Sequence, residues 1–152
     1  MSEPARLLPG SEAPFQSKFQ LGTTLLAIGA GLVVDIGGTI SSEMFVMSQL
    51  GLAAGLAHFP ISFAELSKPS HDPAQLLAGF FHGMSFSFIG GYVAAVIGRN
   101  QPVLNAALFG VATTLTGLLI GGGSPLWINV LGIVTTVPLT MLAGYLVKRT
   151  YR

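Results

Sequence analysis

The sequence has no cysteine and few charged residues: Lys, Arg, Asp and Glu together make up 9% of its 152 residues. Without cysteine, the chain has no disulfide, no thiolate metal site and no thiol redox chemistry. The net charge is only +1, and the basic residues lie near the ends of apolar stretches, which excludes a typical nucleic-acid-binding protein. What is abundant is apolar: 51% of the residues are hydrophobic and 20 are glycine. This composition is typical of a membrane protein with a single domain.

The longest apolar stretch runs from Phe19 to Phe59 and contains two acids, Asp35 and Glu43. One bilayer crossing needs ~20 apolar residues, so this stretch has nearly twice the required length. It could form two short spans separated at Gly37–Glu43. Alternatively, it could form one long helix that is tilted, bent at Gly37-Gly38, or extended beyond the outer headgroups.

The basic residues distinguish these alternatives. Two short spans would give five crossings and would place Arg99 on the opposite side of the membrane from Lys148 and Arg149. One long helix gives four crossings and leaves only Lys68 outside, which satisfies the positive-inside rule. The basic residues then expected in the cytoplasm are Arg6, Lys18, Arg99, Lys148, Arg149 and Arg152. We therefore predict an all-α, integral membrane four-helix bundle in the inner (plasma) membrane, with a long first helix and both termini cytoplasmic (N-in/C-in).

The predicted ranges are a cytoplasmic tail (1–18), a transmembrane domain (19–149) with spans at about 19–59, 73–98, 102–121 and 125–148, and a cytoplasmic end (150–152). Two of the helix starts carry a capping residue followed by proline. Asp72-Pro73, with Gln75 to complete a capping box, begins the second helix, and Ser124-Pro125 begins the fourth. Pro138 lies inside the fourth helix, where we expect a bend.

Asp35 is the residue whose predicted position in the membrane is energetically the most unfavourable. It lies ~24 Å along the helix from Phe19, within the hydrocarbon, where an ionised carboxylate must either take up a proton or pair with a donor. His82 on the second helix is expected at a similar depth and is the predicted partner. Glu43 is ~12 Å farther out. Steps of three and four along the first helix place the following residues on one inward face: Thr24, Gly31, Asp35, Thr39, Ser42 and Gln49.

The candidate intramembrane polar site therefore comprises Asp35, His82, Glu43, Thr39 and Ser42. It has two interpretations: a relay that titrates protons or binds a cation in a small carrier, or a polar clamp that fixes the register of the helices. The intramembrane threonines are expected to bond back to carbonyls of their own helices instead of contributing to the site. They are Thr113, Thr114, Thr116, Thr135, Thr136 and Thr140.

No catalytic residue, metal site or cofactor is predicted. His58 and His71 are expected in solvent at the outer face, and the spacing of the histidines and acids lacks the pattern of a zinc site. No serine has a base and an orienting acid placed to activate it, so we do not expect an enzyme.

Two glycine pairs, Gly51/Gly55 and Gly117/Gly121, have the four-residue spacing that lets transmembrane helices approach closely. A four-helix unit rich in glycine and without a soluble domain favours association with other membrane subunits or with itself. The predicted partners are therefore the lipid bilayer and other membrane proteins or a second copy, with no nucleic acid.

The segments Val34–Thr39 (VDIGGT) and Gly90–Ala95 (GGYVAA), the latter followed by Arg99, resemble a diffuse group of small four-span membrane proteins of prokaryotes. The resemblance covers most of the chain. It implies a four-span topology and a location in the cell membrane, and it implies no activity.

The sequence thus favours a structural or accessory subunit of a membrane protein complex. The alternative is a small proton-coupled carrier or channel that uses an intramembrane site at Asp35 and His82.

Overall fold

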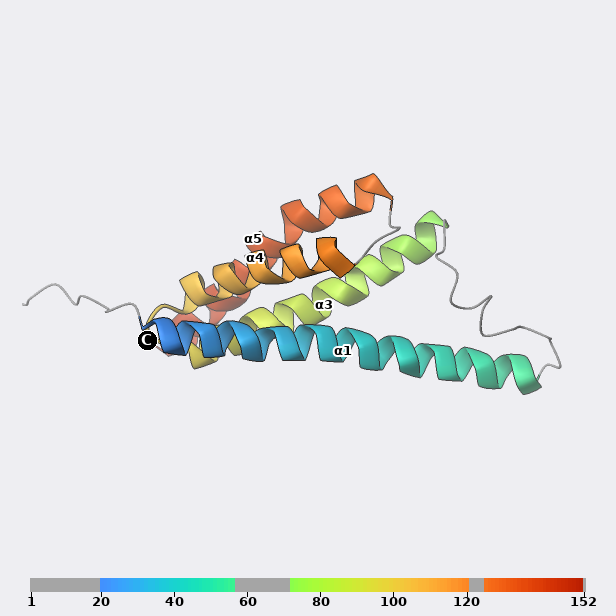
Figure 1. The fold of residues 1–152 in the computed structure, drawn as a ribbon, viewed down its shortest axis with the longest axis horizontal. Helices are drawn as coiled ribbons and strands as arrows, with labels where there is room; N and C mark the ends of the chain where they lie inside the picture. Colours follow the sequence, from blue (N-terminus) through green and yellow to red (C-terminus); the bar gives the residue numbers. More distant parts are fainter. Residues whose placement is uncertain (1–19, 57–71, 121–124, 152) are drawn as a thin grey trace, which may run out of the picture.

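The structure is a computed structural model that describes residues 20–56, 72–120 and 125–151. Its described residues form four helices (Figure 1): α1 (Leu21–Leu56), α3 (Pro73–Ile97), α4 (Pro102–Ile120) and α5 (Leu126–Thr150). Each contains a stretch long and apolar enough to cross a membrane. The predicted all-α architecture with four such helices is confirmed, and it supports a multi-pass membrane protein.

Helix α1 is continuous through Gly37-Gly38, so the alternative of two short spans separated there is wrong. Its 36 residues give a length of ~54 Å, compared with ~30 Å for the hydrocarbon core of a bilayer. At Gly38 a side chain would collide with the ring of Phe86 on α3, whereas at Gly37 it would meet nothing within 4 Å. The absence of a side chain at Gly38 therefore lets the Phe86 ring pack directly against the α1 backbone.

The helix ends follow most of the predicted signals. Asp72 caps α3 by accepting a hydrogen bond from the Ala74 backbone N–H at 3.0 Å, and Pro73 is the first helical residue. Gly98 ends α3, and Pro102 begins α4. At the start of α5 the prediction is wrong by one position, because Pro125 itself is the N-cap and makes no side-chain capping bond. Ser124 lies outside the described residues.

Small side chains fill most of the interior. The fully buried hydrophobic residues are alanines on all four helices, together with Phe109 of α4 and, at 1% exposure, Val147 of α5. Helix α3 packs against each of the other three helices. Because the central side chains are small, the backbones approach closely, as is usual where transmembrane helices associate.

On the predicted inward face of α1, Thr24, Gly31 and Asp35 are buried, and Thr39 and Ser42 are half-buried. Apolar residues away from this face are exposed, including Leu26 (65%) and Val33 (73%). The side chain of Gln49 lies outside the described residues.

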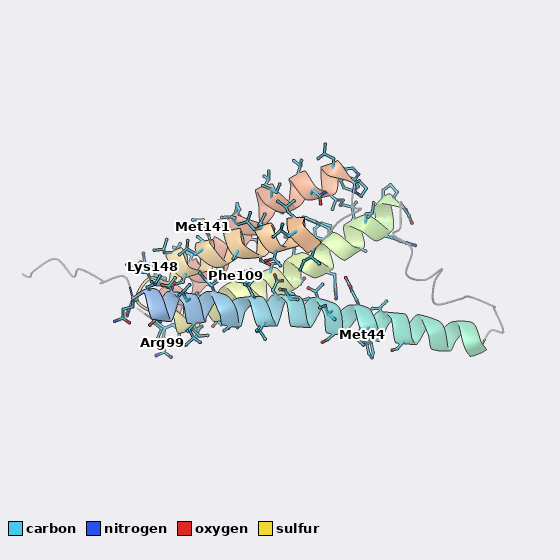
Figure 2. The ribbon with its side chains drawn as sticks, in the orientation of Figure 1. Met44, Arg99, Phe109, Met141 and Lys148 are labelled. Atoms are coloured by element: carbon cyan, nitrogen blue, oxygen red, sulfur yellow. The ribbon has the colours of Figure 1, made fainter. Side chains whose placement is uncertain are left out.

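The start of α1 and the end of α5 lie at the same end of the bundle (Figure 1). This end also carries Arg99 and Lys148 (Figure 2), and the Arg99 guanidinium lies 5.1 Å from the centre of the Tyr151 ring. We refer to it as the Arg99 end. At the opposite end, termed the Asp72 end, α3 and α5 begin and α4 finishes. The helices diverge toward this end, and α1 extends farthest (Figure 1).

Candidate functional site

The Asp35 carboxyl group is held between three helices. The side chain is only 6% exposed. The Ser87 hydroxyl on α3 donates to one carboxyl oxygen at 3.0 Å, and the Thr113 hydroxyl on α4 donates to the other. Both donors are neutral hydroxyl groups, so Asp35 has hydrogen-bond partners but no counter-charge among them.

A close crossing of α1 and α3 places these groups together. A Cβ atom added to Gly31 would lie 2.8 Å from the Gly90 carbonyl oxygen, and one added to Gly90 would lie 2.8 Å from the Gly31 carbonyl oxygen. The same added atom at Gly90 would lie 3.3 Å from the Asp35 Cβ. Only glycine fits at both positions, and one helical turn beyond the crossing Asp35 faces α3.

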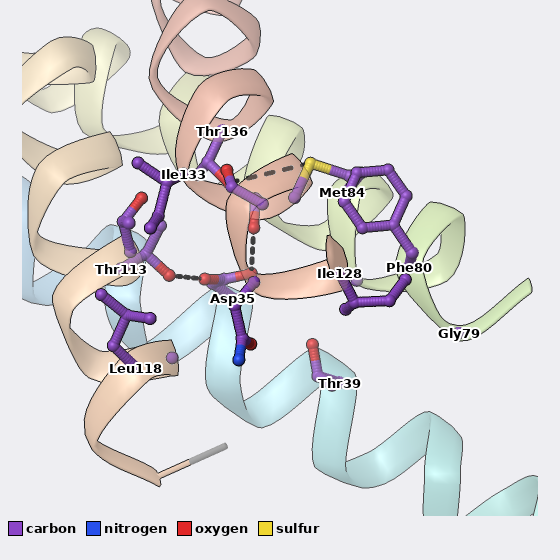
Figure 3. Close-up of a pocket in the computed structure, with 16 residues that line it drawn as sticks. Asp35, Thr39, Gly79, Phe80, Met84, Thr113, Leu118, Ile128, Ile133 and Thr136 are labelled. Carbon is purple, nitrogen blue, oxygen red and sulfur yellow. Dashed lines mark hydrogen bonds between the residues drawn. The ribbon is translucent and has the colours of Figure 1, made fainter. Parts of the chain in front are cut away.

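A cavity of about 280 Å³ extends from Asp35 toward the Asp72 end (Figure 3). All four helices contribute to its wall. The polar lining consists of Asp35 and Thr39 from α1, Ser87 from α3, Thr113 and Thr114 from α4, and Asn129 and Thr136 from α5. Apolar residues such as Phe80, Ile128 and Ile133 complete the wall. The cavity has room for several water molecules and enough polar groups to hold them.

Asp35 is the only titratable residue among the described residues that line this cavity. The wall contributes hydroxyl and amide groups and no lysine or arginine. A carboxylate surrounded by hydroxyl groups and water can accept a proton or attract a small cation, and it has no basic group here to neutralise it.

The structure does not pair Asp35 with His82, as the sequence analysis expected. The His82 Nε2 instead forms a short hydrogen bond with the Ser42 hydroxyl, and the ring packs edge-on against Phe86 with centroids 5.2 Å apart. Ser42 lies seven residues beyond Asp35, which is ~10 Å along α1. The depth predicted for His82 was therefore about two helical turns too great.

The predicted site residues thus separate into two groups. Asp35 and Thr39 both line the cavity, whereas Ser42 and His82 form their own pair nearer the Asp72 end. Glu43 is exposed on α1 and is not part of the cavity wall. Within the described residues, no three histidine or acidic side chains come together as a metal-binding group.

The sequence analysis missed Ser87, Thr113 and Asn129. Thr113 was expected to bond to its own helix, and this prediction is wrong because its hydroxyl donates to Asp35. The other five intramembrane threonines do bond to carbonyls of their own helices, as predicted. A signal for Ser87 was present: Gly83, Ser87, Gly90 and Ala94 follow one another at steps of three and four, which marks an inward face of small residues.

Among the described glycines, the close helix contacts do not include Gly117, the one member of the predicted pairs whose surroundings are described. A side chain at Gly117 would meet nothing within 4 Å, so this glycine does not pack against another of the described helices. The surroundings of Gly51 and Gly55, and the whole of Gly121, lie outside the described residues. Close approach instead occurs at Gly31, Gly90, Gly91, Gly110 and Gly144.

Comparison of the chain with protein-family models, with curated proteins and with solved structures gave no match. The geometry and chemistry of the cavity are therefore the basis for assigning a function.

Proposed function

We propose that this small multi-pass protein moves protons across the membrane, as a carrier or a channel, and that Asp35 is the group that binds them. One observation carries the proposal: a polar cavity between the transmembrane helices ends at a buried carboxyl group that has no basic partner among the residues lining it. Acidic groups at such positions in membrane proteins commonly form part of proton or ion pathways.

The contacts of Asp35 suit a proton better than a metal ion. Water in the cavity can transfer a proton to the carboxylate. The Ser87 and Thr113 hydroxyls, which donate to the carboxylate, can each rotate to accept a hydrogen bond from the protonated acid. The site can therefore satisfy both protonation states. A dehydrated metal cation usually requires more oxygen ligands than one carboxyl group and two hydroxyls.

The sidedness follows from charge. Arg99, Lys148 and Arg149 end their helices at the Arg99 end, which the positive-inside rule places in the cytoplasm of a cell whose inner membrane holds the protein. The cavity then faces the outer compartment, and both termini are cytoplasmic.

Proton flux into proteoliposomes tests the proposal. Purified protein is reconstituted with an entrapped pH-sensitive dye, and an inward proton gradient is imposed. The unaltered protein should acidify the interior, and Asp35→Asn should slow acidification by at least about tenfold, because an amide cannot exchange a proton. Glu43→Gln, which removes an exposed acid from the same helix, is the matched control and should leave flux unchanged.

Equal flux in the two variants would contradict the role of Asp35. A further measurement with an imposed sodium gradient at constant pH distinguishes a cation path. Sodium uptake that depends on Asp35, without acidification, would replace the proton by a metal cation as the bound species.

A second candidate, an accessory subunit of a membrane complex, is favoured by a different observation. Beyond the cavity, the side chains of Met44 (68% exposed), Phe45 (65%) and Val46 (50%) on α1 are left uncovered by the described helices. Isolation from native membranes in nanodiscs tests this role. A stoichiometric partner, or a second copy, that is lost in Phe45→Glu but kept in Phe45→Leu would support it, whereas a monomer with full proton flux would contradict it.

A further inference from the structure

A second, smaller polar pocket lies on the opposite side of Asp35 from the cavity. It is formed at the Arg99 end, where α1 begins, α3 ends and α4 begins. Its space of about 10 Å³ is close to the minimum that holds one water molecule. Two polar residues that line it, Thr24 and Asn105, are buried.

The amide of Asn105 defines what this pocket can bind. Its nitrogen donates to the carbonyl oxygens of Gly98 and Gln101, both at 3.0 Å. These two acceptors fix the orientation of the amide, because a rotation by about 180° would place the Asn105 Oδ1 against the two carbonyl oxygens. The Asn105 Oδ1 is buried and has no hydrogen-bond partner among the described residues. A buried acceptor without a donor is costly, so the pocket suits a ligand that donates hydrogen bonds and has the size of water.

One aromatic ring lies between this pocket and the cavity. Asn105, Phe109 and Thr113 follow at steps of four on α4, so they lie on the same face at successive turns. Phe109 is fully buried and, by residue volume, the largest such side chain among the described residues. Its ring carbons would come within 2.7 Å of a Cβ added at Gly31 or at Gly90. The ring thus fills the space left by the glycines at the crossing of α1 and α3, directly inward of Asp35.

We propose that the Asn105 pocket is the inner station of the proton path and that Phe109 is the gate between it and Asp35. This inference rests on the proposed function. When the ring moves aside, water enters the apolar layer, the proton leaves the Asp35 carboxyl group for a water molecule, and the Asn105 Oδ1 accepts a hydrogen bond from the resulting hydronium. The proton then passes to water at the Arg99 end. Apolar constrictions that exclude water form gates of this kind in channels.

No other titratable residue among the described residues lines either space, so Asp35 alone would bind the proton between the two sides. The asparagine in the inner station stays neutral, which prevents it from trapping the proton. The apolar layer around the ring also includes Ala27 and Ala94, with Ile28, Leu32 and Ile97 packed against it, and Phe109 is its largest fully buried side chain.

Cysteine accessibility tests the gate without a measurement of proton flux. Because the natural chain has no cysteine, an introduced cysteine is its only reactive thiol. Thr113→Cys in proteoliposomes of known orientation is exposed to a membrane-impermeant thiol reagent from one side at a time. It should react from the Asp72 end only. Adding Phe109→Ala, or the smaller change Phe109→Leu, should allow reaction from the Arg99 end as well. Phe88→Ala on α3 is the control and should leave labelling one-sided.

Filling the inner pocket tests the station. Thr24→Leu occupies the space without removing the bonds of Asn105 to the turn, and it should reduce proton flux, whereas Gly29→Leu, at a position where an added Cβ meets nothing, should not. If Phe109→Leu leaves labelling one-sided and Thr24→Leu keeps full flux, the inference is overturned even when flux depends on Asp35. If the labelling pattern appears but the protein moves no protons, the water path stands and the proposed function fails.

Discussion

The Asp35 carboxyl group takes a hydrogen bond from Thr113 across a helix interface, and this contact should be measurable as a coupling energy. Thr113→Val keeps the shape of the side chain and removes the hydroxyl. We expect the free energy of unfolding to fall by about 1–3 kcal/mol, because a buried acceptor loses its donor. The same substitution in an Asp35→Leu background should cost much less, and the difference is the coupling between the two side chains.

Thr116→Val is the matched control. Its hydroxyl donates at 2.9 Å to the Ala112 carbonyl of its own helix, so it should show no coupling to Asp35. Unfolding in detergent, followed by helical circular dichroism, measures all the variants. A coupling that is equal for the two threonines would remove the Thr113 contact from the description of the site.

The sequence identified Asp35 and not its partners, for a physical reason. A carboxyl group deep in hydrocarbon is costly whatever surrounds it in sequence, and its depth follows from counting residues along the helix. A threonine inside a helix has its own carbonyl four residues earlier as the default acceptor. Thr113 departs from this default only because α4 is rotated so that its hydroxyl faces Asp35, and the rotation of a helix follows from packing against its neighbours. His82 was assigned to Asp35 on depth alone, which is too coarse to select one partner among several.

The crossing of α1 and α3 depends on two glycines, and this dependence predicts the outcome of an alanine substitution. Gly90→Ala would place a methyl group 2.7 Å from the Phe109 ring and 2.8 Å from the Gly31 carbonyl oxygen. We expect it to lower the free energy of unfolding by about 1–3 kcal/mol, the usual cost of overpacking. Thermal unfolding of the purified protein in detergent is the measurement.

Gly37→Ala provides the comparison on α1, since a Cβ there meets nothing within 4 Å. It should be neutral or stabilising by up to about 1 kcal/mol, because alanine favours a helix over glycine. A Gly90→Ala variant as stable as Gly37→Ala would mean that the two helices cross less closely than the structure has them.

The helices themselves were predictable because each signal is local. Apolar length, the Asp72-Pro73 start and the Gly98 stop all act within one helix or its ends. The crossing glycines were not predictable in the same way. A chain with 20 glycines has many pairs at helical spacing, and only the packed structure shows that Gly31 and Gly90 meet while Gly117 meets nothing.

The molecule is asymmetric along its long axis, with basic residues gathered at the Arg99 end and the helices diverging toward the Asp72 end (Figures 1 and 2). The cavity lies in the half where the helices diverge. Phe109 and the Asn105 pocket lie in the half nearer the Arg99 end. The compartment toward which the cavity opens therefore depends on which end faces the cytoplasm. The positive-inside rule predicts that the Arg99 end faces the cytoplasm.

Two single cysteines measure this orientation directly. Thr150→Cys lies at the end of α5 beside the basic residues, and Gln75→Cys lies in the first turn of α3; both positions are exposed. An impermeant thiol reagent should label Gln75→Cys in intact cells or right-side-out vesicles and Thr150→Cys only in inside-out vesicles. Labelling of both positions from one side would contradict the prediction that α3, α4 and α5 each cross the membrane between them. The reverse pattern would place the cavity toward the cytoplasm.

The crossing of the long first helix can be tested in the same way. Because α1 begins at the same end as Thr150, a cysteine at the exposed position Leu21 should be labelled from the same side as Thr150→Cys.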